Sequence, residues 1–135
     1  MPDKAFIDTN VLVYSLSTDG ARSVKARQTL LSSPAAVVSS QVINEFISIC
    51  LKKNLLALDD AAEAANGFMR ALLFVPVQES TINRALRIVK KYRFSYWDSL
   101  IAASALENGC SVLFTEDMQH GQVINNRLRI VNPFQ

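Results

Sequence analysis

Residues 6–15, FIDTNVLVYS, place Asp8, Thr9 and Asn10 between two apolar runs. The run before these polar residues is typical of the end of a buried strand, and the run after them is typical of a helix that begins near residue 11. Asn10 is a plausible cap for that helix. An Asp at such a junction is explained by a turn as well as by a site, so its meaning depends on the other acids of the chain.

Short apolar runs alternate with helical patterns along the chain, which indicates an α/β fold with a parallel sheet covered by helices on both faces. Because no linker or repeat divides this pattern, we expect one domain over residues 1–135. Pro76 predicts that its strand lies at a sheet edge or ends early. The expected strands are 4–7, 35–40, 74–78, 110–117 and 127–134. One helix is expected to begin at residue 11, and the other expected helices are 20–33, 41–53, 58–73, 79–92 and 96–109.

The pattern also predicts which way the side chains of two helices point. Trp97 heads an apolar stripe with Leu100 and Ile101, so we expect its ring to pack in the core. In the segment 79–92 the inward face is expected to consist of Ile82, Ala85, Leu86 and Val89.

The composition excludes several classes of protein. Hydrophobic residues make up 50% of the chain, but no apolar run approaches the roughly 20 residues of a membrane span. The start, MPDKAFID, lacks the basic residues and long apolar stretch of a signal peptide, so we expect a soluble cytoplasmic protein. A net charge of +2 is too small to indicate a nucleic-acid partner by itself.

The cysteines and the histidine favour structural roles. Cys50 and Cys110 are far apart and neither belongs to a Cys-x-x-Cys pair, so we expect two buried thiols rather than a disulfide framework or a zinc site. His120 is the only histidine and lies in a predicted turn. A Ser-His-Asp triad or a histidine metal site would have to use this residue.

Four acids from distant segments are predicted to meet at one edge of the sheet. Asp8 follows the first strand, and Asp117, with Glu116 before it, follows the fourth. Glu45 and Asp98 lie in the first turns of helices that begin at the same edge, where open sheets of this type bind ligands.

Each acid also has a purely structural explanation. Asp8 suits a turn, residues 115–117 suit a polar loop, and Glu45 lies opposite the apolar face of its helix, where a solvated Glu is the default. Ser95 and Asp98 match a capping box. The joint placement of the four acids is what favours a site.

A divalent cation is the simplest explanation for clustered carboxylates, which otherwise repel one another and raise each other's pKa. Mg²⁺ prefers a few carboxylates and several waters. Such a site fits phosphodiester hydrolysis, because the metal can activate a water and neutralise charge on the phosphate while a spare carboxylate acts as base. We predict Asp8 and Asp98 as metal ligands. Glu45 and Asp117 would complete or tune the site, or bind a second metal. Supporting hydrogen bonds are expected from Thr9, Asn10 and Thr115, and Glu116 lies beside the site.

The chain resembles PIN-domain nucleases, and within them VapC-type toxins of bacterial toxin–antitoxin pairs. The likeness spans almost the whole sequence. The matching pieces, in the expected order, are FIDTNVLVY (6–14), VVSSQVINEF (37–46), FSYWDSLIAASALENGC (94–110) and LFTEDMQHG (113–121).

This resemblance implies a three-layer α/β/α fold with a five-stranded parallel sheet, and cleavage of RNA that depends on Mg²⁺ or Mn²⁺. The catalytic quartet of the family maps onto Asp8, Glu45, Asp98 and Asp117, and its supporting polar residues onto Asn10 and Thr115. The resemblance also implies a homodimer and an antitoxin partner whose tail enters the active-site groove. Contact with DNA would arise only through the antitoxin, and no membrane is involved.

Two features could hold RNA. Arg84, Arg87 and Lys91 share one stripe of their helix and could follow phosphates. A solvated helix face is the simpler interpretation of this stripe, so RNA binding by it is a hypothesis. Tyr96 and Trp97 stand beside Asp98 and could stack on bases, although we favour the core for Trp97.

Two other functions are compatible with acids at a sheet edge. A phosphotransfer domain also gathers acids around Mg²⁺, but an aspartyl phosphatase needs a second acid where this chain has Asn10. A receiver domain needs an acceptor Asp after its middle strand and a lysine after a late strand, and neither is evident. A non-catalytic binding module would tolerate loss of a quartet acid, yet all four are present.

Overall fold

The computed structural model describes residues 4–18 and 20–135, and its strands form one sheet. The strands are β1 (Ala5–Ile7), β2 (Ala36–Ser39), β3 (Leu73–Val75), β4 (Val112–Phe114), β5 (Val123–Ile124) and β6 (Leu128–Val131). The helices are α1 (Thr9–Ser15), α2 (Gly20–Leu31), α3 (Ser40–Lys52), α4 (Leu58–Ala71), α5 (Glu79–Tyr92) and α6 (Tyr96–Glu107).

The sheet has the order β3-β2-β1-β4-β6-β5 and is parallel except for β5. In its centre, Ala5 of β1 lies opposite Ala36 of β2 and Val112 of β4. The predicted fold class is therefore confirmed, and β3 ends before Pro76 at the edge of the sheet, as expected. The sheet has six strands rather than five. The extra strand, β5, is antiparallel to β6 and two residues long, which is too short to produce a periodic pattern.

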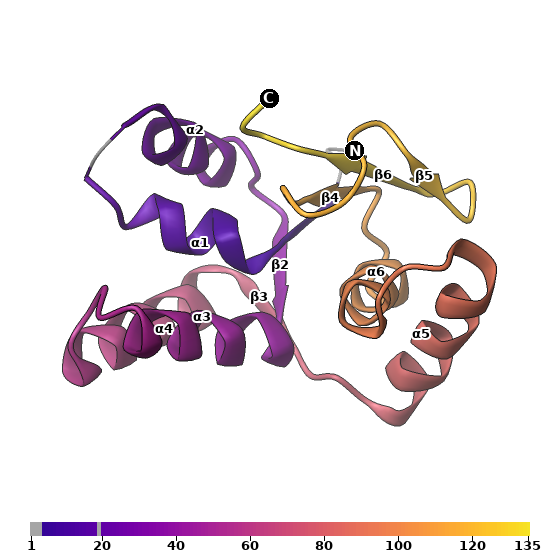
Figure 1. The fold of residues 1–135 in the computed structure, drawn as a ribbon, viewed down its shortest axis with the longest axis horizontal. Coiled ribbons are helices and arrows are strands. Elements are labelled where there is room, and N and C mark those ends of the chain that lie inside the picture. The colour runs from indigo at the N-terminus through magenta and orange to yellow at the C-terminus, as the bar shows by residue number, and fades with distance from the viewer. Residues whose placement is uncertain (1–3, 19) are drawn as a thin grey trace.

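Helices cover both faces of the sheet, so the molecule has three layers (Figure 1). In this view α1 to α4 lie to the left of the central strands, and α5 and α6 lie to the right. Helix α6 contacts β2, β4 and β6, whereas α5 packs mainly against α6. Among the described residues, no helix is long and apolar enough to cross a membrane.

The core forms where the central strands meet α3 and α6. Phe6 and Ile7 of β1 and Leu113 of β4 are completely buried, as strands covered on both faces must be. Phe46 of α3 is also completely buried and packs edge-to-face against Phe68 of α4. The two cysteines are free and buried, as predicted.

Two sequence-based expectations about helix α5 and its neighbour α6 are wrong. Ile82 and Leu86 of α5 are 40% and 49% exposed, because the buried stripe runs through Thr81, Ala85 and Ile88 instead. Thr81 can face α6 because its hydroxyl donates to Glu107 Oε1 at 2.8 Å, which satisfies a buried polar group. The other expectation concerned Trp97, whose ring is 64% exposed and does not pack in the core.

The cap of the first helix also differs from the expectation. Asp8, rather than Asn10, is the N-cap residue of α1, and its carboxylate accepts a hydrogen bond from the Thr9 amide. Helix α1 therefore begins two residues earlier than predicted, and Asn10 lies inside it. The shift leaves the Asn10 side chain free to reach another segment.

Truncating the Phe46 side chain should strongly destabilise the fold. Phe46→Ala leaves a cavity between α3 and α4, so the free energy of unfolding should fall by about 3–5 kcal/mol. Chemical denaturation followed by circular dichroism measures this loss. Leu31→Ala, at a side chain that is 87% exposed, is the control and should change stability little. Equal losses for the two variants would contradict the packing of Phe46.

Candidate active site

Asp8 lies where β1 passes into α1, at the carboxyl edge of the sheet. Its backbone amide donates to the carbonyl of Phe114 at 3.0 Å, which continues the ladder between β1 and β4. Both of its carboxylate oxygens are hydrogen-bonded. Oδ1 accepts from the Thr9 amide at 2.7 Å, and Oδ2 accepts from the Thr115 hydroxyl at 2.7 Å. These bonds fix a carboxylate that is only 6% exposed.

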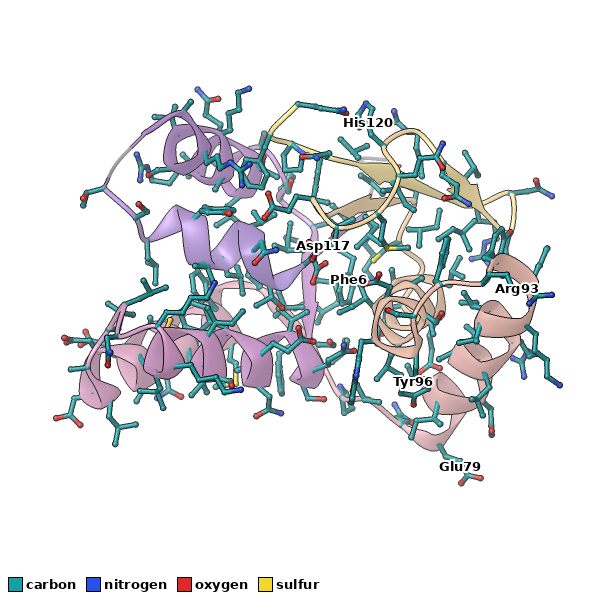
Figure 2. All side chains as sticks on the ribbon, viewed as in Figure 1. Phe6, Glu79, Arg93, Tyr96, Asp117 and His120 are labelled. Atoms are coloured by element: carbon teal, nitrogen blue, oxygen red, sulfur yellow. The ribbon has the colours of Figure 1, made fainter. Side chains whose placement is uncertain are left out.

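Thr115 joins the first acid to the last. Its hydroxyl donates to Asp8 and accepts a hydrogen bond from the backbone amide of Asp117 at 3.1 Å. The Asn10 side-chain amide donates to Asp117 Oδ2 at 3.3 Å. Asp117 is exposed, and Figure 2 shows it in the middle of the view, between α1 and α6. The structure therefore brings together Asp8, Asn10, Thr115 and Asp117 as the sequence predicted.

Glu45 reaches the site from the second turn of α3. Ser39 caps this helix through a hydrogen bond from the Val42 amide to its side chain. The Glu45 carboxylate is half-buried and accepts a hydrogen bond from Gln41 Nε2 at 2.8 Å. Gln41 also donates to the backbone carbonyl of Trp97 at 3.3 Å, so one amide connects the start of α3 to the start of α6.

Asp98 lies in the first turn of α6. The Asp98 amide donates to the Ser95 hydroxyl at 3.1 Å, so the predicted cap is present. The Asp98 side chain is half-buried. A carboxylate in this position is stabilised by the positive end of the helix, and that stabilisation does not prevent it from taking part in a site.

The four acids form one electrostatic cluster. Asp8 interacts with Asp117 and with Glu45. Glu45 and Asp117 interact with each other, and both also interact with Asp98. The four acids predicted from the sequence are thus neighbours in the structure, and the assignment of Asp8 and Asp98 as metal ligands stays a prediction.

Burial raises the pKa of every acid in the cluster, and repulsion by neighbouring carboxylates adds to it for Asp8, Glu45 and Asp117. Burial is the main cause for Asp8, whose pKa rises from 3.8 to about 6, against the opposing effect of its hydrogen bonds from Thr115 and Thr9. Burial also raises the pKa of Glu45, and the hydrogen bond from the Gln41 amide counteracts it. The Thr9 hydroxyl, by contrast, is buried without a hydrogen-bond partner among the described residues, so only the backbone amide of Thr9 supports the site. The pKa of Asp98 is raised by burial, and that of Asp117 by burial and then by Asp98 and Glu116.

Glu116, which lies beside the cluster, is paired with a cation. Its carboxylate forms an ion pair with Arg22 at 2.8 Å and accepts a hydrogen bond from the Tyr14 hydroxyl at 3.1 Å. Arg22 also lies over the rings of Tyr14 and Phe134. Nothing in the sequence pattern pointed to Arg22, because the contact depends on how α2 packs beside the loop after β4.

Among the described residues, Arg22–Glu116 is the single ion pair, so none of the four clustered acids is neutralised by a basic side chain. The donor set therefore fits a divalent cation, which would relieve the repulsion. Within the same described part of the chain, however, no three acids, cysteines or histidines are close enough to form a ready ligand set. The quartet is a group of neighbouring acids rather than a finished coordination sphere.

The predicted basic stripe lies on helix α5. Arg84, Arg87 and Lys91 line a hollow of about 290 Å³ on α5, together with Ile88 and Asn125. Lys91 donates to the Asn125 side chain at 3.4 Å. None of the four acids belongs to α5, and in Figure 2 the two labelled ends of this helix lie well to the right of Asp117.

His120, near the top of that view, accepts a hydrogen bond from the Asn132 amide.

Comparison with known families identifies the fold. A model of the PIN domain matches residues 5–124. Because this match covers most of the chain, the protein belongs to the PIN domain family, which confirms the resemblance seen in the sequence. No curated protein matches the sequence significantly.

Solved structures share the fold at low sequence identity. A toxin–antitoxin complex from Klebsiella pneumoniae matches with a TM-score of 0.73 and 21% identity, over 96% of this chain and 98% of that one. DNA-bound VapBC from Salmonella typhimurium matches with a TM-score of 0.72 and 20% identity, over 96% and 97% of the two chains. VapC20 from Mycobacterium tuberculosis, described as a toxin that cleaves the sarcin–ricin loop, matches with a TM-score of 0.68 and 19% identity, over 84% and 90%.

Ionisation of Asp8 is expected to weaken the metal-free fold as the pH rises. Because the folded-state pKa of about 6 lies above the ordinary value of 3.8, the folded protein binds this proton more tightly than the unfolded chain does. The resulting stabilisation is complete below pH 3.8 and is lost as the pH passes about 6, with a limit of about 3 kcal/mol.

Asp8→Asn removes this titration, so the variant should gain stability relative to the wild type as the pH rises through this range. Urea denaturation in EDTA measures the free energy of unfolding of both proteins. Leu31→Ala, at an exposed side chain that does not titrate, is the control and should show no such trend. A difference between Asp8→Asn and wild type that does not depend on pH would contradict the assignment.

Proposed function

We propose that this PIN domain is a divalent-metal-dependent endoribonuclease and the toxin of a toxin–antitoxin pair. The observation that carries the proposal is the cluster of Asp8, Glu45, Asp98 and Asp117, whose carboxylates interact electrostatically and have no basic partner among the described residues. A divalent cation would relieve the repulsion between these unpaired carboxylates. Phosphodiester hydrolysis is a reaction that such a cation assists.

Asp8 and Asp98 are the residues that would hold the metal, Mg²⁺ or Mn²⁺, and Asp117 would complete or tune the site. When bound, the metal neutralises charge on the phosphate and makes water a better nucleophile. Asp8 is held for this role by its bonds from Thr115 and Thr9, and Asp117 by its bond from Asn10. These bonds orient carboxylates that would otherwise turn away from one another.

Glu45 is suited to take the proton from the attacking water. Its pKa is raised, which makes it a stronger base than an ordinary carboxylate, and its side chain is half-exposed. The bond from Gln41 fixes its orientation. In Asp8, by contrast, both oxygens are already hydrogen-bonded and the carboxylate is almost fully buried.

The structural relatives support the biological half of the proposal. They include toxin–antitoxin complexes and a toxin described as cleaving the sarcin–ricin loop. We therefore propose an RNA substrate, an antitoxin partner that covers the acids, and contact with DNA only through that partner. A homodimer acting in the cytoplasm completes this proposal.

A phosphotransfer function is less compatible with the site. The position two residues after Asp8 holds Asn10, whose amide donates to Asp117 and provides no second carboxylate. A non-catalytic role gives no reason for a cluster of four acids that has no basic partner among the described residues.

Removing the charge of one clustered acid should abolish RNA cleavage. Asp8→Asn and Asp98→Asn each take away a carboxylate without changing the size of the side chain, so metal binding is lost while packing is kept. Cleavage of a mixed small-RNA pool is measured with Mg²⁺ or Mn²⁺ and with EDTA, using protein purified free of bound antitoxin. Asp59→Asn is the matched control and should cleave like the wild type. Unimpaired cleavage by the purified Asp8 and Asp98 variants would refute the assignment.

Arg87→Ala should weaken RNA binding more at low salt than at high salt. Arg87 is exposed in the basic hollow of α5, and its attraction for phosphate is screened by added ions. Binding of a labelled RNA to the inactive Asp98→Asn protein, measured across a salt series, gives the slope of affinity against salt. Arg70→Ala, at the exposed end of α4, is the control. A salt-independent effect of Arg87→Ala would show that the stripe does not follow phosphates.

A further inference from the structure

A groove of about 650 Å³ opens beside the acid cluster, between the start of α3 and the start of α6. Its size lies within the range of roughly 300–1,000 Å³ typical of small-ligand sites. Its walls combine amides, hydroxyls and one large aromatic ring. The groove is lined, among others, by Gln41, Asn44, Glu45, Ser48, Trp97 and Leu100.

Trp97 is the unusual member of this set. The eight residues Ser99–Leu106 of the same helix are all buried, yet the Trp97 side chain is 64% exposed. Its ring packs edge-to-face against Tyr96, with the centroids 5.4 Å apart and an interplanar angle of 69°. This edge contact leaves ring surface open on the groove. A flat ring of this kind stacks on nucleobases irrespective of their sequence.

Gln41 provides a second, independent observation. Its Nε2 faces two acceptors, the Glu45 carboxylate and the Trp97 carbonyl, which fixes the orientation of the amide. Its Oε1 is consequently left buried without a hydrogen-bond partner among the described residues, and the side chain as a whole is only 9% exposed. Such an acceptor is uncommon in folded proteins and marks a position where a donor from outside the chain is expected.

The groove is continuous with the acids. Glu45 lines it and also interacts with Asp117 and Asp98, and Trp97 directly precedes Asp98 in the chain. A nucleotide whose phosphate lies at the acids therefore has its base, or that of its neighbour, within reach of the groove. Asn44, exposed in the groove wall, carries a donor and an acceptor that can pair with the edge of a base.

We propose that this groove is a nucleobase subsite for single-stranded RNA, in which Trp97 stacks on the base and the Asn44 amide reads its edge. The inference rests on the proposed nuclease function and names how its substrate is held. The expected occupant is an unpaired base, because a base inside a duplex has no free face on which the Trp97 ring could stack. A segment of a protein partner is the competing occupant.

Trp97 is the only tryptophan of the sequence, so the tryptophan fluorescence of the protein reports on this groove. The wild-type protein in EDTA is titrated at low salt with RNA hexamers of adenosine, of cytidine and of uridine, and with a hexamer of abasic ribose phosphate. The base-containing hexamers should quench the fluorescence to saturation. The abasic hexamer should bind about tenfold more weakly and quench little, because the stacking contribution is lost.

Substitutions separate stacking from general affinity, with a fluorescently labelled hexamer followed by anisotropy. Trp97→Leu should weaken binding about tenfold, and Trp97→Phe should recover part of that loss because it keeps a ring. Asn44→Ala should change the relative affinities for the three hexamers, as expected for a residue that reads the base edge. Phe74→Leu, at an exposed ring on the edge strand β3, is the matched control and should bind like the wild type.

Equal binding of the abasic and base-containing hexamers, or unchanged binding by Trp97→Leu, would overturn the subsite and assign the groove to a protein segment. RNA cleavage by the same preparations keeps this failure distinct from that of the proposed function. If Trp97→Leu binds and cleaves like the wild type, the nuclease stands without the subsite. If RNA quenches Trp97 but no preparation cleaves with either metal, the subsite stands and the nuclease does not.

Discussion

The hydrogen bond from the Thr115 hydroxyl to Asp8 Oδ2 holds the two central strands and the site in one arrangement. It is 2.7 Å long and joins the end of β1 to the residue that follows β4, in a place where both partners are buried. The same hydroxyl accepts the Asp117 amide, so the loop after β4 is positioned by the residue that starts α1. Within the low dielectric of the interior, bonds of this kind are strong and their loss is costly.

The site combines this rigid centre with acids whose repulsion is not neutralised within the described part of the chain. Burial raises the pKa of Asp8 to about 6, and the neighbouring carboxylates act in the same direction. Clustered acids with raised pKa values are typical of functional sites, which is why these residues form the candidate active site. The Gln41 acceptor without a partner and the exposed Trp97 ring point to an external ligand in the groove next to the acids.

Much of the fold was readable because strand and helix patterns were clear. The strand expected over 35–40 and the helix expected over 41–53, for example, are observed as β2 (Ala36–Ser39) and α3 (Ser40–Lys52). The errors fall where tertiary contacts override the local pattern. Trp97 follows the helical spacing of a core residue, but it is 64% exposed and lines the groove beside the start of α3.

The sequence by itself determined that acids would follow the first and fourth strands and start two helices, because parallel strands end at a common edge and their helices begin there. It also determined the family, through motifs that the match over residues 5–124 confirms. Only the tertiary structure decided that Thr115 joins Asp8 to the Asp117 amide, that Arg22 pairs with Glu116, and that Gln41 joins Glu45 to Trp97. These features depend on how α2, α3 and α6 pack against the sheet, and periodicity along a chain carries no information about contacts between segments that are far apart in sequence.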